Sequence, residues 1–284
     1  MDELDFIHTP PKSGYDADIA YEFFNSVGNE EIVKANKTIF VEDEKGSRLL
    51  LQRDKMYFLL EGEVEITINE NPIATVHQGE IFGEMATLSR SARSATATTK
   101  TPCQVISLNE KQFHAGLRKM PEFALMMMSV MVHRLREMLS RLNETGALLD
   151  SDEWKESSVF DKKLLAELKE EIGESSIMRY TSGKLIMQEG QAGVFMYVVL
   201  EGQVAVTIHD RIVEKVSPGG MFGEMALIER GERLANAVAE TDCVLLAINR
   251  NVFLELVKEN PEFGFALLSA VGERALFMAS QLAA

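Results

Sequence analysis

A glutamate and an arginine nine positions apart are the side chains of this chain best suited to bind a ligand. Glu84 lies in the segment Phe-Gly-Glu-Met-Ala, and Arg93 follows it. The same segment and pair recur 140 positions later in both cases (84 to 224, 93 to 233), as Glu224 and Arg233. A single pair of this kind would be read as a surface ion pair, which contributes about 0–1 kcal/mol. Two copies in one register indicate a duplicated binding site instead.

The residue types around each pair suit an anion. A glycine lets the backbone turn tightly, and the free N–H groups at the start of a helical turn favour negative charge. Arg93 and Arg233 each supply a planar cation that can bind two phosphate oxygens. The carboxylates of Glu84 and Glu224 would repel a phosphate, so we expect them to accept hydrogen bonds from a neutral group such as a ribose hydroxyl.

Each predicted site combines a glycine, the glutamate, the two residues after it, the arginine and the two residues after that. Arg134 and Arg274, on the helices predicted to close the two halves, are candidate secondary partners of the glutamates. The predicted binding residues are Gly83, Glu84, Met85, Ala86, Arg93, Ser94 and Ala95 in the first half, and Gly223, Glu224, Met225, Ala226, Arg233, Leu234 and Ala235 in the second.

Short strands must position these side chains. Apolar or alternating runs predict strands at residues 38–41, 56–60, 64–68 and 105–108, with glycine-rich turns between several of them. Many short strands with this punctuation favour a sandwich or jelly roll, here with flanking helices, so the fold is predicted to be mainly β within an α+β class.

Helical patterns flank the predicted strands. The first starts at Tyr15 and stops at Gly28, a long apolar one runs from Pro121 to Leu142, and another covers Phe160 to Ile172. The long helix is more apolar than one small sheet requires. We therefore expect part of it to contact another domain or subunit, which makes a homodimer through the long helices a further expectation.

The internal repeat divides the 284 residues into two domains. We predict the first at 1–150, with an N-terminal leader and the long closing helix, and the second at 151–284, with its own N-terminal and closing helices. Residues 143–158 are predicted to be a polar linker. The first copy has about seven more residues before Met56 than the second has before its equivalent, and we place them in a hairpin loop.

Composition excludes several classes of protein. A net charge of −15 and a pI of about 4.9 argue against direct nucleic-acid binding. No apolar run is long enough to span a bilayer, and the acidic start is unlike a secretory signal, so we expect a cytoplasmic protein. Cys103 and Cys243, at equivalent repeat positions, are predicted to be buried thiols. The five histidines lack metal-ligand spacing, so no metal and no catalytic activity are predicted.

The duplicated segment resembles the phosphate-binding cassette of the cyclic nucleotide-binding domain family, Phe-Gly-Glu-x-Ala followed by Arg-x-Ala. The resemblance covers nearly the whole chain as two tandem copies. It implies an eight-stranded β-roll in each half and a closing helix that caps the base. It also implies that Glu84 and Glu224 bind the ribose 2′-hydroxyl, that Arg93 and Arg233 bind the cyclic phosphate, and that cAMP, or else cGMP, is the ligand.

The two cassettes differ directly after the arginine. Ser94 has a hydroxyl that can reach the phosphate or the exocyclic amine of guanine, whereas Leu234 has none. If the sites have different ligand preferences, we expect the first to accept cGMP more readily.

The chain is therefore predicted to be a tandem cyclic-nucleotide receptor that signals to an effector protein by helix rearrangement. Neither a helix-turn-helix domain nor a basic kinase-inhibitor segment is seen in the sequence. One alternative is an interaction or dimerisation scaffold that keeps the fold without responding to nucleotide. A weaker alternative is a transcription regulator that acts with a separate DNA-binding chain.

Overall fold

The computed structural model describes residues 14–44, 55–89, 92–145, 159–208, 211–227 and 232–283, without the side chains of 89, 134–145, 226 and 275–283. The chain divides into two compact units, Met1–Arg141 with Val271–Ala284, and Leu142–Ala270. The predicted boundary between residues 150 and 151 and the predicted hairpin insertion lie outside the described residues.

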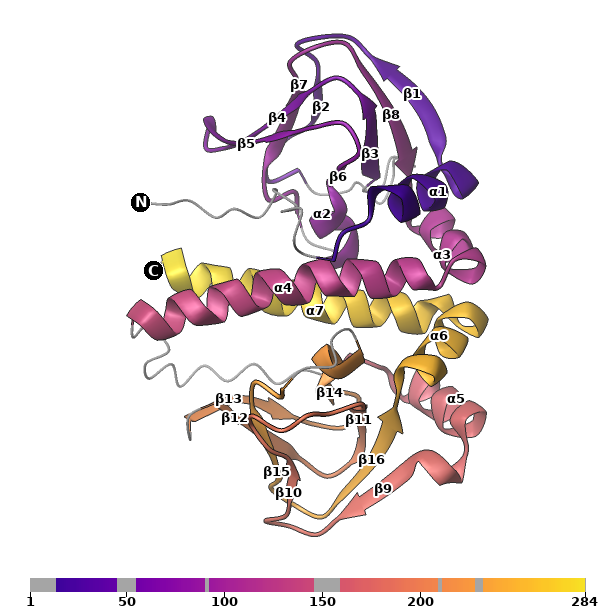
Figure 1. The fold of residues 1–284 in the computed structure, drawn as a ribbon, viewed down its shortest axis with the longest axis vertical. Helices are drawn as coiled ribbons and strands as arrows, with labels where there is room; N and C mark the ends of the chain where they lie inside the picture. Colours follow the sequence, from indigo (N-terminus) through magenta and orange to yellow (C-terminus); the bar gives the residue numbers. More distant parts are fainter. Residues whose placement is uncertain are drawn as a thin grey trace. The chain divides into compact units, whose positions relative to one another are not determined.

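The first unit contains two four-stranded antiparallel sheets that face each other as a roll (Figure 1). One sheet has the strand order β1-β8-β3-β6 and the other β2-β7-β4-β5. We call strands β1–β8 the first roll. Their bounds are β1 Asn29–Val33, β2 Thr38–Phe40, β3 Met56–Glu61, β4 Val64–Ile68, β5 Asn71–Val76, β6 Ile81–Phe82, β7 Thr96–Thr99 and β8 Cys103–Leu108.

Apolar side chains from both sheets fill the interior of the first roll. Tyr57 on β3 and Phe82 on β6 stack with their ring centroids 5.0 Å apart. Val64 and Ile66, alternate residues of β4, are buried in the same cluster. The cassette that follows Phe82 is thus attached to a close-packed core.

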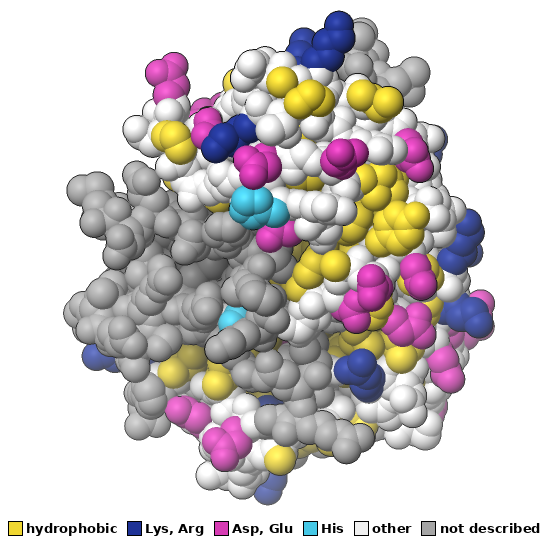
Figure 2. Space-filling model, turned by 45° about the horizontal axis from the view of Figure 1, so that its top comes forward, with side chains coloured by type: hydrophobic (Ala, Val, Ile, Leu, Met, Phe, Trp, Pro, Cys, Tyr) yellow, Lys and Arg dark blue, Asp and Glu magenta, His cyan; other side chains and the backbone are white. Residues whose placement is uncertain are grey.

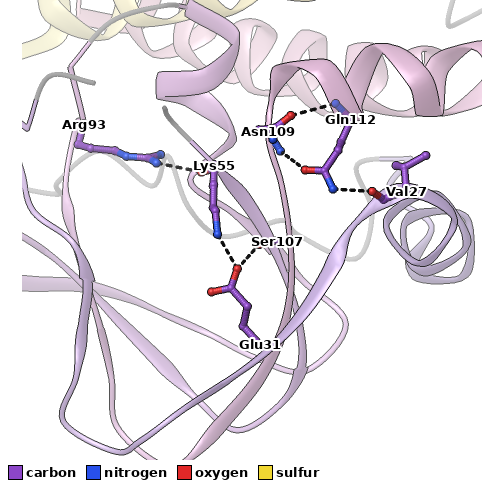
Figure 3. Close-up of polar contacts among 7 residues, drawn as sticks. All are labelled: Val27, Glu31, Lys55, Arg93, Ser107, Asn109 and Gln112. Atoms are coloured by element: carbon purple, nitrogen blue, oxygen red, sulfur yellow. Dashed lines mark hydrogen bonds and ion pairs between the residues drawn. The ribbon is translucent and has the colours of Figure 1, made fainter. Parts of the chain in front are cut away.

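Helices cover the ends of the first roll, namely α1 Ala17–Val27, α2 Glu84–Ser89, α3 Glu110–Lys119 and α4 Glu122–Thr145. Asn109 and Gln112 form a capping box at the start of α3, and Gln112 Nε2 donates to Val27 O at 2.7 Å (Figure 3). Phe23 of α1 stacks on Phe123 of α4, with the ring centroids 3.6 Å apart. These contacts fix α1, α3 and the first part of α4 as one layer.

The second unit repeats this arrangement, with strand orders β14-β11-β16-β9 and β10-β15-β12-β13. We call strands β9–β16 the second roll. Its elements are α5 Lys162–Ile172, the 3-10 helix η1 Glu174–Ser176, β9 Ile177–Tyr180, β10 Leu185–Met187, β11 Met196–Glu201, β12 Val204–Ile208, β13 Arg211–Val216, β14 Met221–Phe222, the 3-10 helix η2 Glu224–Leu227, β15 Asn236–Ala239, β16 Cys243–Ile248, α6 Arg250–Glu259 and α7 Pro261–Ala283.

The predicted fold class is confirmed, since the chain has four antiparallel sheets in two tandem rolls with flanking helices. Several boundaries differ from the predictions by one or two residues, and α1 begins at Ala17 rather than Tyr15. Helix α4 continues to Thr145, three residues into the predicted linker, and α5 begins at Lys162 behind the cap residue Asp161. Phe160 is therefore not helical, and it stacks on Phe263 instead.

Both cysteines are free and buried, as predicted. Each thiol has two main-chain carbonyls within reach of its single S–H donor, those of Glu63 and Thr101 for Cys103, and those of Gln203 and Thr241 for Cys243. In the described parts of the chain, no helix has the length and hydropathy required to cross a bilayer.

Candidate functional site

The first cassette is a tight turn that leads from strand β6 into helix α2. Gly83 makes the turn with φ of 73°, a left-handed conformation that favours glycine. A side chain there would also be tightly crowded, because a Cβ atom would lie 3.0 Å from the Phe40 ring and 3.1 Å from Nη1 of Arg93. The glycine therefore brings the turn into contact with the arginine predicted to bind phosphate.

Arg93 is held against this turn by main-chain carbonyls. Its Nη1 donates to Gly83 O at 2.8 Å and its Nη2 donates to Lys55 O at 2.9 Å. The guanidinium carbon lies 4.2 Å from the centroid of the Phe40 ring, within the range of a cation–π contact. Only 5% of the residue is exposed, so the cation is fixed inside the roll rather than extended into solvent.

The main chain of each arginine is fixed by the loop that follows β2 or β10. Arg93 N donates to Glu44 O at 3.1 Å, and Asp43 N donates to Arg93 O at 2.9 Å. Asp43 has φ of 61°, and its counterpart in the second roll is a glycine with φ of 78°. The matching bonds there run from Arg233 N to Gln191 O at 2.8 Å and from Gly190 N to Arg233 O at 2.9 Å.

The carboxylate of Glu84 lies at the start of α2 and is buried, with 7% of the residue exposed. Tyr15, just before α1, is close enough for the two groups to interact electrostatically. Burial raises the pKa of Tyr15, and the charges of Glu80, Glu84 and Asp16 raise it further. The phenol stays protonated as a result, and its hydroxyl donates to Gly79 O at 2.7 Å.

The second cassette repeats this geometry with small changes. Arg233 Nη1 donates to Gly223 O at 3.0 Å and Nη2 donates to Phe195 O at 2.7 Å. Glu224 is buried, with 5% exposed, at the start of η2. Burial lowers the pKa of Arg233, while Tyr197 and Glu224 act to raise it. An arginine remains charged under such conditions, so both rolls present a fixed cation beside a buried carboxylate.

Gly193 packs directly on the guanidinium of Arg233. A Cβ atom at Gly193 would lie 2.1 Å from Nε and 2.3 Å from Cζ of that arginine. Its φ is outside the left-handed region, so the requirement for glycine is steric. No motif identified this residue, because it lies in the stretch before Met196 where the two copies differ in length.

In the first roll, the predicted residues surround one hollow of about 390 Å³, counted with its opening to solvent. All seven line it, together with Phe40, Ile66 and Phe82. Ser94 is exposed at its edge, whereas Ala95 is buried. In the second roll, Leu234 is 37% exposed, Ala235 is buried, Gly223 and Met225 are half-buried, and the side chain of Ala226 lies outside the description.

The two secondary arginines stay predictions. Arg134 belongs to α4, but its side chain is not among those described. Arg274 is half-buried on α7, in the segment grouped with the first unit.

Two further features bear on ligand type. Within the described residues, no group of three or more His, Cys, Asp or Glu side chains has the arrangement of a metal site. On the described surface visible in Figure 2, Lys and Arg side chains are dispersed among Asp and Glu and form no continuous basic patch.

Comparisons with known proteins agree with this geometry. The family profile described as the cyclic nucleotide-binding domain matches residues 30–119 and 177–260, together more than half of the chain. The chain is 25% identical over 220 residues to a cGMP-dependent protein kinase of Plasmodium berghei. This alignment covers 76% of this chain and 23% of the kinase. It is 23% identical over 273 residues to a cAMP-dependent protein kinase regulatory subunit of Schizosaccharomyces pombe. That alignment covers 90% of this chain and 61% of the subunit.

A solved structure of cAMP-bound PfPKA-R (141-441) is similar over 98% of this chain and 94% of that one, with 20% identity and a TM-score of 0.35. The chain spans less than two thirds of the length of the two curated relatives named above.

Proposed function

Because this chain belongs to the cyclic nucleotide-binding domain family, we propose that it is a tandem receptor in which each roll binds one cyclic nucleotide. The observation that carries the proposal is the duplicated cassette. In each copy a guanidinium is held by a glycine carbonyl and a second carbonyl, next to a buried glutamate. In this proposal the arginine binds the cyclic phosphate, and the glutamate accepts a hydrogen bond from the ribose 2′-hydroxyl.

The chain is proposed to act by binding rather than by catalysis, in the cytoplasm. The signal passes to a partner protein through rearrangement of the closing helices. Since one relative is a cyclic-nucleotide-dependent protein kinase and another is a regulatory subunit of such a kinase, a protein kinase is the first class of partner to test. Direct nucleic-acid binding is not part of the proposal, since the net charge is −15.

Ligand choice between cAMP and cGMP is proposed to differ between the rolls. Ser94 lies exposed at the edge of the first hollow, where its hydroxyl can donate to a phosphate or accept from a guanine amine. Leu234 offers only apolar surface at the same place. The first site is therefore the one proposed to accept cGMP more readily.

Calorimetric titration of the purified protein with cAMP and with cGMP tests the proposal. We expect two binding events for at least one nucleotide. Absence of both heat and thermal stabilisation at millimolar nucleotide refutes it.

A nucleotide-unresponsive scaffold is the second candidate, and one observation favours it. Both Nη atoms of Arg93 already donate to main-chain carbonyls, and only 5% of the residue is exposed. Nucleotide released on denaturing protein purified from cells supports the receptor; its absence, together with no binding in titration, supports the scaffold.

A further inference from the structure

Three polar side chains of the first roll form a cluster next to the predicted phosphate site. Lys55 Nζ donates to Glu31 Oε1 at 2.6 Å, and the hydroxyl of Ser107 donates to the same oxygen. Figure 3 shows both contacts meeting at one carboxylate oxygen. Lys55 and Glu31 are about one third exposed, whereas Ser107 is fully buried. We call these three residues the Lys55 cluster.

The carboxylate of Glu31 is ionised in this setting. Burial acts to raise the pKa of Glu31, but the hydrogen bonds from Lys55 and Ser107 and the charge of Lys55 outweigh it, so the pKa lies below its ordinary value. The ion pair is therefore present near neutral pH.

The cluster connects three strands to the arginine. Glu31 lies on β1 and Ser107 on the adjacent β8, while Lys55 immediately precedes β3, the other neighbour of β8. The carbonyl of Lys55 accepts from Arg93 Nη2 at 2.9 Å, as Figure 3 also shows. Fixing the Lys55 side chain at Glu31 thus fixes the start of β3, and with it the acceptor that orients the guanidinium.

The second roll replaces all three polar positions with apolar ones. Glu31 pairs with Val105, and its counterpart Met178 pairs with Leu245. The same register, read through the cross-strand pairs Tyr57–Ser107 and Tyr197–Ala247, places Ala247 at the position of Ser107 and Phe195 at that of Lys55.

The carbonyl of Phe195 nevertheless accepts from Arg233 Nη2 at 2.7 Å. Phe195 and Met178 pack against the apolar core cluster that contains Ala247. The second roll therefore anchors the same acceptor by apolar burial, without an ion pair at these positions.

We infer that Lys55 is a positioning residue for Arg93, and that the Lys55 cluster sets the nucleotide affinity of the first site. In the second site, Phe195 takes the place of Lys55 in holding the carbonyl that accepts from the arginine. The inference rests on the proposed function, because it assigns the cluster a role in cyclic-nucleotide binding. The three positions work as a set, so a change at one should be repaired by converting all three to the residues of the other roll.

The test uses the full chain with Arg233→Ala, so that calorimetry with cAMP reports the first site. Lys55→Met removes the ion pair, and we expect the affinity to fall about threefold to fivefold. The triple variant Glu31→Met, Lys55→Phe and Ser107→Ala should return the affinity to within about twofold of the parent. The matched control is Lys100→Met, which removes a lysine of the first unit that is 45% exposed and paired with Glu65 at 3.7 Å.

Equal affinities for Lys55→Met and Lys100→Met overturn the inference and leave the proposed function standing. If the unsubstituted protein binds neither cAMP nor cGMP, the proposed function is refuted instead. In that case proton exchange at Nε of Arg93, measured by NMR without ligand, decides the positioning role. Faster exchange in Lys55→Met than in Lys100→Met supports the role, and equal exchange overturns it.

Discussion

Gly193→Ala is the substitution for which the structure gives the sharpest expectation. The added methyl group would lie 2.1 to 2.4 Å from three atoms of the Arg233 guanidinium. Contacts below 3.0 Å do not persist, so either the backbone or the arginine must move. The guanidinium is the end of a flexible side chain, whereas Gly193 precedes strand β11, so we expect the guanidinium to shift.

The loss of cAMP affinity can be estimated from the strength of the hydrogen bonds that the Arg233 guanidinium makes. Arg233 donates to Gly223 O at 3.0 Å and to Phe195 O at 2.7 Å, both charge-assisted. Hydrogen bonds to charged groups contribute about 1.5–3 kcal/mol each. If the displaced guanidinium loses one hydrogen bond of this strength to the nucleotide phosphate, cAMP binding at the second site should weaken by about 10- to 150-fold. The free energy of unfolding should fall less, since the displaced cation can reach solvent.

Calorimetry with cAMP in the Arg93→Ala background isolates the second site. Gly183→Ala is the matched control, because Gly183 has φ of 79° and no atom within 4 Å of an added Cβ. That variant should lose about 1–2 kcal/mol of stability through backbone strain and keep its affinity. If Gly193→Ala binds cAMP as tightly as the parent, the fixed guanidinium is not what determines affinity.

The remaining predictions concern the first roll. Glu84→Ala removes the buried carboxylate and should weaken cAMP binding there by about tenfold or more, measured in the Arg233→Ala background; an unchanged affinity contradicts a ribose contact. Ser94→Leu should lower the affinity for cGMP more than that for cAMP, and an equal loss would show that the hydroxyl does not read the base. Since Glu31 has a lowered pKa in the folded chain, its ion pair stabilises the fold above about pH 4.5 and this contribution disappears as the pH falls further. Unfolding followed against pH should therefore show less acid sensitivity for Glu31→Gln, by under about 1 kcal/mol because solvent screens the pair; an identical pH dependence contradicts the argument.

The side chains predicted from the sequence were found because their types are informative and their spacing is repeated. Glu84 with Arg93, and Glu224 with Arg233, carry charge that few other residues can supply. The strand Asn29–Val33 was missed because its residues are exposed or half-buried, so it lacks the alternation of a strand packed on a core. It lies at the edge of its sheet, paired on one side with β8.

Other parts of the site have no signal in one sequence. Tyr15 reaches Gly79 across 64 positions, a contact that only the tertiary fold creates. Lys55 and Phe195 hold the arginines through their carbonyls, which every residue type has. Their side chains differ in charge and size, so their equivalence emerges only from the strand register.

Anchoring a cation on main-chain carbonyls also has a consequence for divergence between the two halves. No substitution can delete a carbonyl, so positions 55 and 195 can change identity while the acceptor remains, as long as the strand entry stays in place. Mutation can therefore retune one half without erasing the geometry of its arginine. Duplicated halves built in this way can drift toward different sensitivities while both keep their cassettes.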